Sequence, residues 1–448
     1  MKTFLSLTEI SGAMRRGEVT PSQLVAGCLE RIDRFEDSVK AWVLVDSSGA
    51  LEAAQRLTQE LAAGKCRGPL HGIPLGIKDI VDVAGMPTRA GSALTSASPA
   101  QEDATVVDRL RQAGAIILGK TITTEFACFD PSPTRNPWNL THTPGGSSSG
   151  SAAAVSLGMC LGALASQTGG SITRPASYCG VASCKPTFGR VSRAGVVPVG
   201  FHLDHVGAIA RTAADTATIL HTISGDDPRD PAVSPRENFK WPMNANHEPP
   251  RLGVIRPFFF TRADEEVARL TQQAIDGLRQ GGATVIEISL PDCFDDVHAM
   301  HRRIMAAEAA DYHFAQFSAP RPGYGPNMAG LLEEGFAVSM SDYQEALRHQ
   351  KLFQNALARS LVDLDALLTP ATPTAAPGLE TTGDPRFNSP WSYAGVPTVS
   401  IPCALTGEDL PIALQFIGPA WSEARLLSTA IWAEKQLGFH AIPGMLQT

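Results

Sequence analysis

The sequence is short of charged side chains, of basic residues in particular, and of long apolar runs, and each shortage excludes a class of protein. Charged residues make up 18% of the 448 positions, and the formal net charge is −8. A nucleic-acid-binding surface usually needs clustered Lys and Arg, which this balance argues against. Apolar runs such as 152–155 are far shorter than the roughly 18 residues of a membrane span, and the first residues lack the apolar core of a signal peptide. We therefore expect no nucleic-acid partner, no membrane and a cytoplasmic location.

Cysteine and histidine are present, but they show none of the spacings that make a metal site or a disulfide framework. The eight cysteines include no Cys-x-x-Cys pair, and the 11 histidines include no His-Glu-x-x-His motif. His202 and His205 flank Asp204, and one interpretation is that they bind a metal. We favour the other, that they belong to a hydrogen-bonded structural turn. Glu125 and Asp130 are also interpreted as structural. We therefore expect reduced thiols, no metal and no cofactor.

Glycine and proline are what the sequence has in excess. It holds 40 glycines and 33 prolines, too many for a long coiled coil, while 43% hydrophobic residues are enough for a sizeable core and exclude a disordered chain. Half of the glycines, 20 of the 40, fall within 64–210. Glycine at this density indicates turns and close backbone approaches in one part of the chain.

Short apolar runs alternate with amphipathic segments, which predicts an α/β fold. Buried strands are predicted at 72–80, 115–118, 161–167, 252–255, 284–288, 366–368, 398–401 and 412–417. Helices are predicted at 20–32, 106–113, 151–158, 264–279 and about 421–437, and in most of 295–360 apart from a Pro/Gly-rich break at 320–326. No linker separates two parts, so we predict a single domain, 1–448, whose sheet uses strands from both ends of the chain.

Three features within the glycine-rich part are candidates for chemistry. The segment 146–150 fits the Gly-x-Ser-x-Gly nucleophile elbow with Ser148 as nucleophile, but no apolar strand precedes it, so that interpretation is poor. The segment 167–171 follows an apolar strand, and backbone N–H groups around its glycine pair can converge on an oxyanion. Lys78 lies in an apolar run, where burial would lower its pKa and leave a neutral amine. Taken singly, 167–171 can also be explained as a simple turn, and Lys78 as a strand-end lysine whose amine reaches water.

Together, the three features predict nucleophilic catalysis without histidine or metal. Ser171 would attack a carbonyl group, a serine of 147–149 would relay the proton, and a neutral Lys78 would be the base. Such Ser–Lys arrangements are a variant of the serine nucleophile that needs no imidazole.

These residues resemble the motifs of the amidase signature family, and the resemblance extends over nearly the whole chain. The Gly/Ser-rich stretch of the family resembles 144–155 and continues through 167–171, and its lysine motif resembles 72–79. Further similar segments are 184–187, 203–207 and 395–402. The resemblance implies a large mixed β-sheet covered on both faces by helices. It places the motif-bearing core at about 64–210 and a more variable, largely helical substrate-side region at about 295–360.

The resemblance also implies roles for single residues. Ser171 would be the acylated nucleophile, Ser147 the bridging serine after a cis peptide bond, and Lys78 the general base and acid. The oxyanion hole would be formed by the backbone amides of Thr168, Gly169, Gly170 and Ser171.

Two departures from the family pattern point to a subgroup. Ser149 stands where the family has Gly, and Thr173 stands where it has Arg, with Arg174 directly before Pro175. Both departures resemble small-amide hydrolases such as malonamidase and carboxybiuret hydrolase, and in malonamidase the matching arginine binds the substrate carboxylate. We expect Arg174 either to bind a carboxylate through paired hydrogen bonds or to brace its loop through backbone carbonyls.

We therefore predict an amidase that hydrolyses the C–N bond of a small amide, with a carboxylate on the substrate if Arg174 binds one. The alternative is the glutaminase (A) subunit of a tRNA-dependent amidotransferase, against which Ser149, Thr173 and Arg174 argue. The expected partners are a small-molecule amide substrate and a second copy of the chain in a homodimer, with no nucleic acid.

Overall fold

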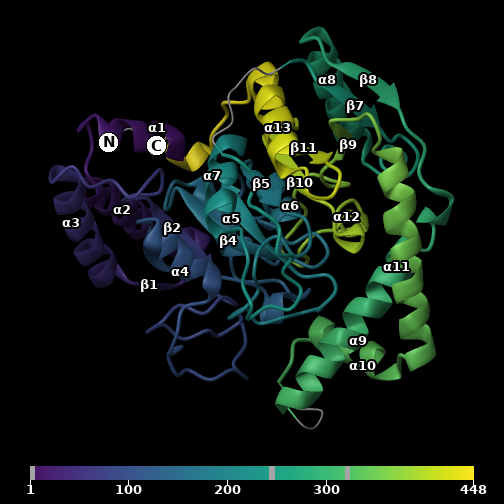
Figure 1. Cartoon of the computed structure of the whole chain (residues 1–448), viewed down its shortest axis with the longest axis horizontal. Coiled ribbons are helices and arrows are strands. Elements are labelled where there is room, and N and C mark those ends of the chain that lie inside the picture. Colours follow the sequence, from purple (N-terminus) through teal and green to yellow (C-terminus); the bar gives the residue numbers. More distant parts are fainter. Residues whose placement is uncertain (1–5, 242–247, 318–322, 448) are drawn as a thin grey trace.

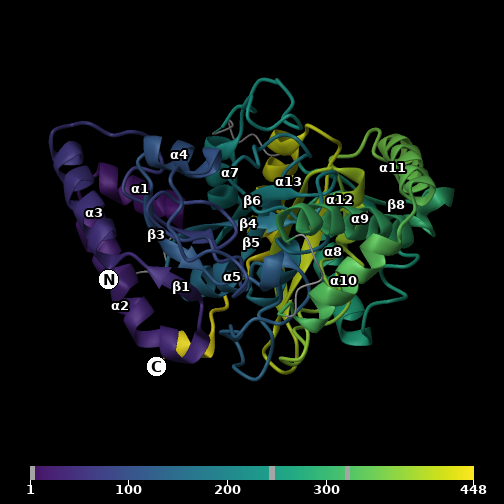
Figure 2. The same ribbon diagram turned by 90° about the horizontal axis from the view of Figure 1, so that it is seen from below.

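The fold is built around one β-sheet that combines strands from both ends of the chain (Figures 1 and 2). The computed structural model describes residues 6–241, 248–317 and 323–447. The strands are β1 (Trp42–Val45), β2 (Pro74–Lys78), β3 (Ile116–Thr121), β4 (Gly162–Gln167), β5 (Ala182–Lys185), β6 (His205–Ala210), β7 (Arg251–Val254), β8 (Thr284–Glu287), β9 (Ala366–Pro370), β10 (Thr398–Leu405) and β11 (Pro411–Ile417). Their order across the sheet is β1-β3-β2-β4-β6-β5-β10-β11-β9-β7-β8.

The sheet is mixed, and its two halves meet at one antiparallel pair. β2 runs parallel to both β3 and β4, and β7 runs parallel to β8 and β9, whereas the other neighbours are antiparallel. Strands from the first 210 residues lie on one side of the β5–β10 pair, and strands from residue 251 onward lie on the other. At this seam, Ser183 pairs with Ser400, and their hydroxyl oxygens are 2.8 Å apart.

Helices cover both faces of the sheet. They are α1 (Leu7–Arg15), α2 (Pro21–Val39), α3 (Ser47–Ala62), α4 (Thr105–Gln112), α5 (Ser149–Ser156), α6 (Thr173–Tyr178), α7 (Ala213–Ile223), α8 (Glu265–Gln280), α9 (Val297–Phe317), α10 (Pro326–Ala337), α11 (Met340–Ser360), α12 (Ser389–Ala394) and α13 (Glu423–Leu437). Alternate side chains of β4 enter two separate cores, because successive strand residues face opposite sides. Ala163 and Ala165 belong to the core that includes residues of α2, α3 and α5, and Leu164 belongs to the core that includes residues of α4, α7 and α13. The predicted fold class, a large mixed sheet covered on both faces, is confirmed.

Local sequence signals account for several helix ends. Thr20 caps α2 by accepting from the amide of Gln23, whose side chain accepts in turn from the amide of Thr20, and Pro21 occupies the first turn. The small residues of α5 allow it to pack closely against the sheet. A Cβ atom at Gly150 would lie 2.1 Å from the carbonyl oxygen of Ala41, so only glycine fits there.

Several predicted elements are confirmed, and others were not foreseen. The predicted βαβ unit matches β7, α8 and β8, which pair in parallel. β5 and β6 were not predicted, because they are short and rich in Ala, Ser and Gly rather than in alternating large apolar residues. Residues 1–5 of the segment considered as a signal peptide, and residues 320–322 of the predicted break, lie outside the described residues.

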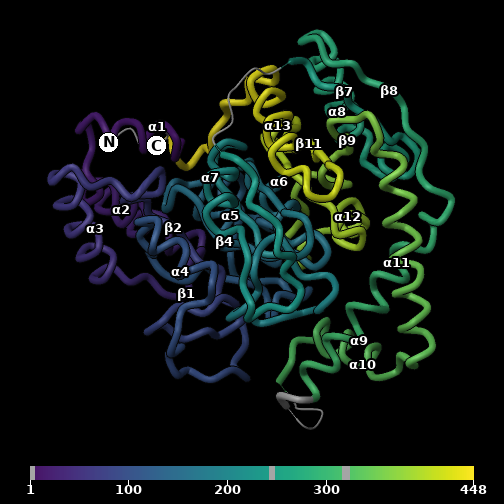
Figure 3. Tube along the Cα trace, in the orientation of Figure 1, coloured from purple at the N-terminus to yellow at the C-terminus, as the bar shows by residue number. Residues whose placement is uncertain are grey.

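The helical region between β8 and β9 stands apart from the sheet. The tube in Figure 3 shows α9, α10 and α11 together as a green group, and α9 and α11 both contact α12. Among the described helices, none is both long enough and apolar enough to cross a bilayer.

Candidate active site

The candidate catalytic residues meet where two parallel strands end at the same edge of the sheet. β2 and β4 are neighbours, with Ile77 paired to Leu164. Lys78 is the last residue of β2, and the turn 168–171 follows the last residue of β4. Because parallel strands end at one edge, residues far apart in sequence are brought together there. Ser147 reaches the same place from the loop that precedes α5.

Lys78 is enclosed in the protein without a carboxylate bonded to its amine. Its side chain has no exposed surface, and Nζ lies 2.6 Å from Ser147 Oγ and 2.8 Å from Ser166 Oγ. Burial lowers the pKa of Lys78 to about 7, although the more distant Asp204 opposes this change. A large share of the amine is therefore neutral at neutral pH and can accept a proton.

Two other buried lysines show that burial alone does not make a base. Lys120 lies 2.9 Å from the carboxylate of Asp79, and neither side chain is exposed. Lys185 donates to the carbonyl oxygens of Pro186 and Val396. Lys78 differs from Lys120 in having no carboxylate bonded to its amine among the described residues, and from Lys185 in contacting two hydroxyl groups, which are able to give up or relay a proton.

The peptide bond between Gly146 and Ser147 is cis, as the family resemblance implied. The carbonyl oxygen of Ser147 accepts from the amide of Thr124 at 3.2 Å, which anchors the segment to the end of β3. Ser147 Oγ is therefore held beside the amine of Lys78.

The turn 168–171 is fixed by hydrogen bonds to the carbonyl groups of Thr168, Gly169 and Gly170. The carbonyl oxygens of Thr168 and Gly169 accept from His301 Nε2 at 2.9 Å and from Ser392 Oγ at 3.0 Å. Within the described chain, the amides of Gly169, Gly170 and Ser171 donate to no protein acceptor. A tight turn with free N–H groups beside a hydroxyl has the composition of an oxyanion hole.

Glycine is required at position 170. A Cβ atom there would lie 2.6 Å from Oδ1 of Asn388, which is itself fully buried. The next residue, Ser171, is 8% exposed and faces the pocket described below.

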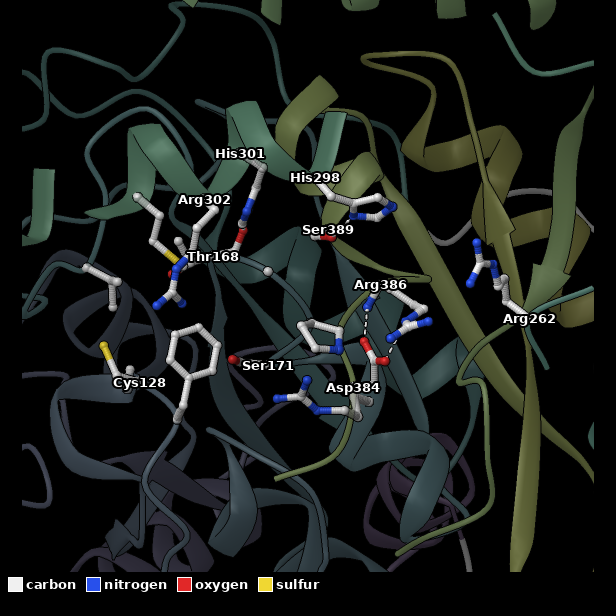
Figure 4. A pocket seen from close by; sticks show the side chains of 18 of the residues that line it. Cys128, Thr168, Ser171, Arg262, His298, His301, Arg302, Asp384, Arg386 and Ser389 are labelled. Atoms are coloured by element: carbon white, nitrogen blue, oxygen red, sulfur yellow. Dashed lines mark hydrogen bonds and ion pairs between the residues drawn. The ribbon is translucent and has the colours of Figure 1, made fainter. Parts of the chain in front are cut away.

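A pocket of about 550 Å³ opens over the turn (Figure 4). Its walls come from the turn and the start of α6, from the helix α9 and from the segment 384–389, which enters α12. Residues 127–129, 199, 258 and 262 complete the lining. Figure 4 shows His298, His301 and Arg302 on one side of the opening and Asp384 and Arg386 on another. The sequence-predicted nucleophile is thus placed in the wall of a cavity large enough for a small molecule.

Arg174 lies in the same wall and is 2% exposed. Its Nη2 donates to the carbonyl oxygen of Gly146 at 2.7 Å and to Thr382 Oγ1 at 3.3 Å. Its Nε and Nη1 have no hydrogen-bond partner among the described residues, and burial lowers the pKa of the guanidinium. One side of Arg174 therefore braces the loop, and the other leaves two buried donors that a carboxylate or carbonyl oxygen would satisfy.

The structure does not favour the nucleophile elbow at Ser148. Ser148 is fully buried, lies outside the pocket lining and donates weakly to the carbonyl oxygen of Ser166 at 3.4 Å. No strand leads into it, since the preceding described strand is β3, which ends at Thr121.

The acidic residues and histidines considered as metal ligands have structural partners. Asp204 accepts from Thr168 Oγ1 at 2.5 Å and from the amides of residues 199 and 200, and Glu308 accepts from His202. Glu125 and Asp130 hold the start of α10 by accepting from amides at residues 325, 327 and 328. In the described part of the chain, no group of three or more His, Cys, Asp or Glu side chains is arranged to hold a metal ion.

Sequence reasoning missed several residues that support the site. Ser166 lies on the Lys78 side of β4, and Gln167 Oε1 accepts from the amides of Ile172 and Thr173, which orients the start of α6. His301 comes from the least characteristic part of the sequence, where a lone histidine on a helix carries no signal. Ser166 could have been found from the alternation of β4, two residues beyond Leu164.

Comparison with known proteins defines the family. The Amidase family model matches residues 23–427, and the chain belongs to this family. The A subunit of the glutamyl-tRNA(Gln) amidotransferase from Halothermothrix orenii is 36% identical over 473 residues, covering 97% of both chains. The solved structure of the same subunit from Thermotoga maritima is 30% identical, with a TM-score of 0.82 over 98% of this chain and 97% of that one.

A further solved structure is even more alike in shape. It is described as an unexpected vestigial protein complex that reveals the evolutionary origins of an s-triazine catabolic enzyme. It is 28% identical, with a TM-score of 0.91, and the likeness covers 98% of this chain and all of that one.

These relatives correct the partner prediction. A small-molecule amide as substrate, a homodimer and no nucleic acid were expected. Relatives 34–36% identical to this chain are subunits of an enzyme whose name includes tRNA. The prediction that excluded nucleic acid is therefore wrong, and these relatives do not support a small-molecule amide and a second copy as the only partners. The prediction that no nucleic acid is bound was based on the acidic net charge, and this charge is a property of one chain and not of an assembly. In an assembly of several chains, another subunit can supply the basic surface that a nucleic acid requires.

Proposed function

We propose that this chain is the ammonia-releasing subunit of an amidotransferase of the tRNA-dependent kind, and that it hydrolyses a carboxamide through an ester on Ser171. The observation that carries the chemical part is the contact of 2.6 Å between the buried amine of Lys78 and Ser147 Oγ, close to a turn with free amides. Two similarities support the proposal that the chain acts within an assembly. The chain is similar to amidotransferase subunits, and the s-triazine-related structure is that of a protein complex.

In the proposed reaction a proton is passed from Ser171 through Ser147 to Lys78, and the same relay later delivers a proton to the leaving nitrogen. Lys78 takes the proton of Ser147, Ser147 takes that of Ser171, and Ser171 Oγ forms a bond to the amide carbon. The carbonyl electrons move to oxygen, and the N–H groups of the turn stabilise that charge. When the C–N bond breaks, the relay returns the proton to nitrogen, and ammonia leaves. Water then attacks the ester, Ser171 regains its proton, and a carboxylate is released.

The substrate end of the pocket fits a carboxamide that also bears a carboxylate. Nε and Nη1 of Arg174 are buried donors without a partner among the described residues, and an anionic oxygen satisfies both. Glutamine meets these requirements, since it has a primary amide and an α-carboxylate. Its use as the nitrogen donor is consistent with an amidotransferase role.

The same proposal includes the setting in which the chain works. We place it in the cytoplasm as one amidase domain with partner subunits, and the eight cysteines, all free thiols, are consistent with a reducing compartment. Direct contact with tRNA would fall to a partner subunit, because this chain carries a net charge of −8.

The test labels the nucleophile with a fluorophosphonate and measures ammonia release from glutamine, with the chain alone and with its co-purified partners. We expect covalent labelling at Ser171, loss of labelling in Ser171→Ala, and labelling at the wild-type rate in Ser148→Ala. Labelling of Ser148 would overturn the assignment of the nucleophile. If glutamine is inert with partners present while another carboxylate-bearing amide is hydrolysed, the chemistry stands and the amidotransferase role falls.

A further inference from the structure

His301 makes a buried contact between the helical region and the oxyanion turn. It lies in α9, its side chain is 5% exposed, and Nε2 is 2.9 Å from the carbonyl oxygen of Thr168. A carbonyl oxygen can only accept, so Nε2 carries the hydrogen of this bond. In Figure 4 the imidazole of His301 reaches down to Thr168 at the edge of the pocket.

The contact matters because of what lies on the other side of the same peptide unit. A peptide unit is planar, and its C=O and N–H groups point in opposite directions. The carbonyl of Thr168 shares its unit with the amide of Gly169, one of the free N–H groups of the turn. Fixing the direction of the carbonyl therefore fixes the direction of the N–H group, and a hydrogen bond to the oxygen makes that N–H group a stronger donor.

Each of the next two peptide units is held in the same way. Ser392 Oγ donates to the carbonyl oxygen of Gly169, which orients the amide of Gly170. The amide of Arg174 donates to the carbonyl oxygen of Gly170 at 2.9 Å, which orients the amide of Ser171. The peptide unit between Thr168 and Gly169 is instead held by His301 of α9. This helix lies outside the motifs shared with the family.

The imidazole itself is held in place. Its ring packs edge-on against Tyr393, with 6.3 Å between the ring centres. Burial lowers the pKa of His301 to about 4, so the ring is neutral near pH 7 and adds no charge beside the pocket. Tyr393 OH donates to the carbonyl oxygen of Ala346 in α11, which ties the same support to a second helix of this region.

We propose that His301 is a positioning residue that orients and strengthens the Gly169 N–H donor of the oxyanion hole through Thr168. This inference rests on the proposed function, because it takes Ser171 as the nucleophile. His301 touches the turn and not the reacting atoms, so its loss should weaken the chemical step more than the binding of substrate.

The test compares His301→Gln, whose terminal amide can reach Thr168, with His301→Phe, which fills the space without a donor. Removing a direct oxyanion donor lowers kcat by about 10²–10³-fold. For His301→Phe we expect a smaller fall of about tenfold to hundredfold in kcat for ammonia release from glutamine with partners present, and in the rate of Ser171 phosphonylation, with KM within about twofold. His301→Gln should recover most of both rates.

A matched control is His71→Phe, which removes a buried imidazole whose Nε2 contacts the carbonyl oxygen of Leu57 instead of the turn. We expect its phosphonylation rate to equal that of the wild type. His301→Asn replaces the Phe variant if the latter does not fold, because its amide is one methylene too short to reach Thr168.

The proposal is overturned if folded His301→Phe or His301→Asn is phosphonylated as fast as the wild type. It is also overturned if His301→Gln is as slow as the Phe variant while both melt like the wild type, because the loss would then come from packing. A wild-type chain that is not labelled at Ser171 contradicts the proposed function instead, so the two failures are distinguishable.

Discussion

Lowering the pH should inactivate the enzyme by protonating Lys78. Burial lowers the pKa of this amine from 10.5 to about 7. The difference corresponds to about 5 kcal/mol against the charged form, and it raises the neutral fraction at pH 7 from roughly 3 in 10⁴ to about one half. Below pH 7 the neutral fraction falls about tenfold for each pH unit, and above pH 8 it is nearly complete. The rate of any step that needs the base should follow this curve.

The rate of Ser171 phosphonylation by a fluorophosphonate measures that step without a choice of substrate. Measured from about pH 5.5 to 9, the second-order rate constant should rise about tenfold per unit up to an inflection near pH 7 and then level off. Lys185→Met is the control, because burial lowers the pKa of Lys185 to about 7 as well, although its amine donates to two backbone carbonyl oxygens. This variant should keep the inflection.

Two results would refute the assignment of Lys78 as the base. One is a rate that stays level down to pH 5.5 in the wild type. The other is an inflection near pH 7 that survives in the residual rate of Lys78→Ala. If the inflection disappears in Lys185→Met, the group that titrates is Lys185 and not Lys78, which also contradicts the assignment.

Three further predictions concern single contacts. Asp79→Asn leaves the buried charge of Lys120 without its partner, so the free energy of unfolding in urea should fall by about 3–5 kcal/mol. Arg174→Leu should raise KM about tenfold or more for glutamine but leave KM for propionamide, which has no carboxylate, almost unchanged; an equal change for both would make the arginine purely structural. Gly150→Ala should lower the melting temperature by several degrees, because its Cβ would collide with the carbonyl oxygen of Ala41, and an unchanged melting curve would contradict this packing.

The central part of the site was predictable because each residue carries a local signal. Lys78 interrupts an apolar run, and the turn 168–171 joins a strand to a glycine pair, so each stands out within a few positions. Ser147 and Ser148 could be told apart as candidates only through the family resemblance. The structure separates them by their contacts, since Ser147 Oγ accepts from the amine of Lys78 whereas Ser148 Oγ donates to the carbonyl oxygen of Ser166.

The supporting contacts were not predictable because they depend on pairs far apart in the chain. His301 and Thr168 are separated by 133 residues, and neither position is unusual in its own segment. The same holds for β5 and β6, which are recognised as strands by their neighbours in the sheet more than by their composition. The partner prediction failed for a related reason, because the charge of one chain does not describe an assembly.

The seam between β5 and β10 has a consequence for how the protein becomes active during its synthesis. Lys78, Ser147 and Ser171 all leave the ribosome with the first half of the sheet, but Ser392, which holds the carbonyl of Gly169, follows 223 residues after that glycine. At about 5–20 residues per second, the interval is roughly 10 to 45 seconds. Throughout that time the nascent chain carries the proposed nucleophile and base without Ser392 and the pocket wall that follows β9. On the proposed mechanism, full activity therefore requires the second half of the sheet to have docked on β5.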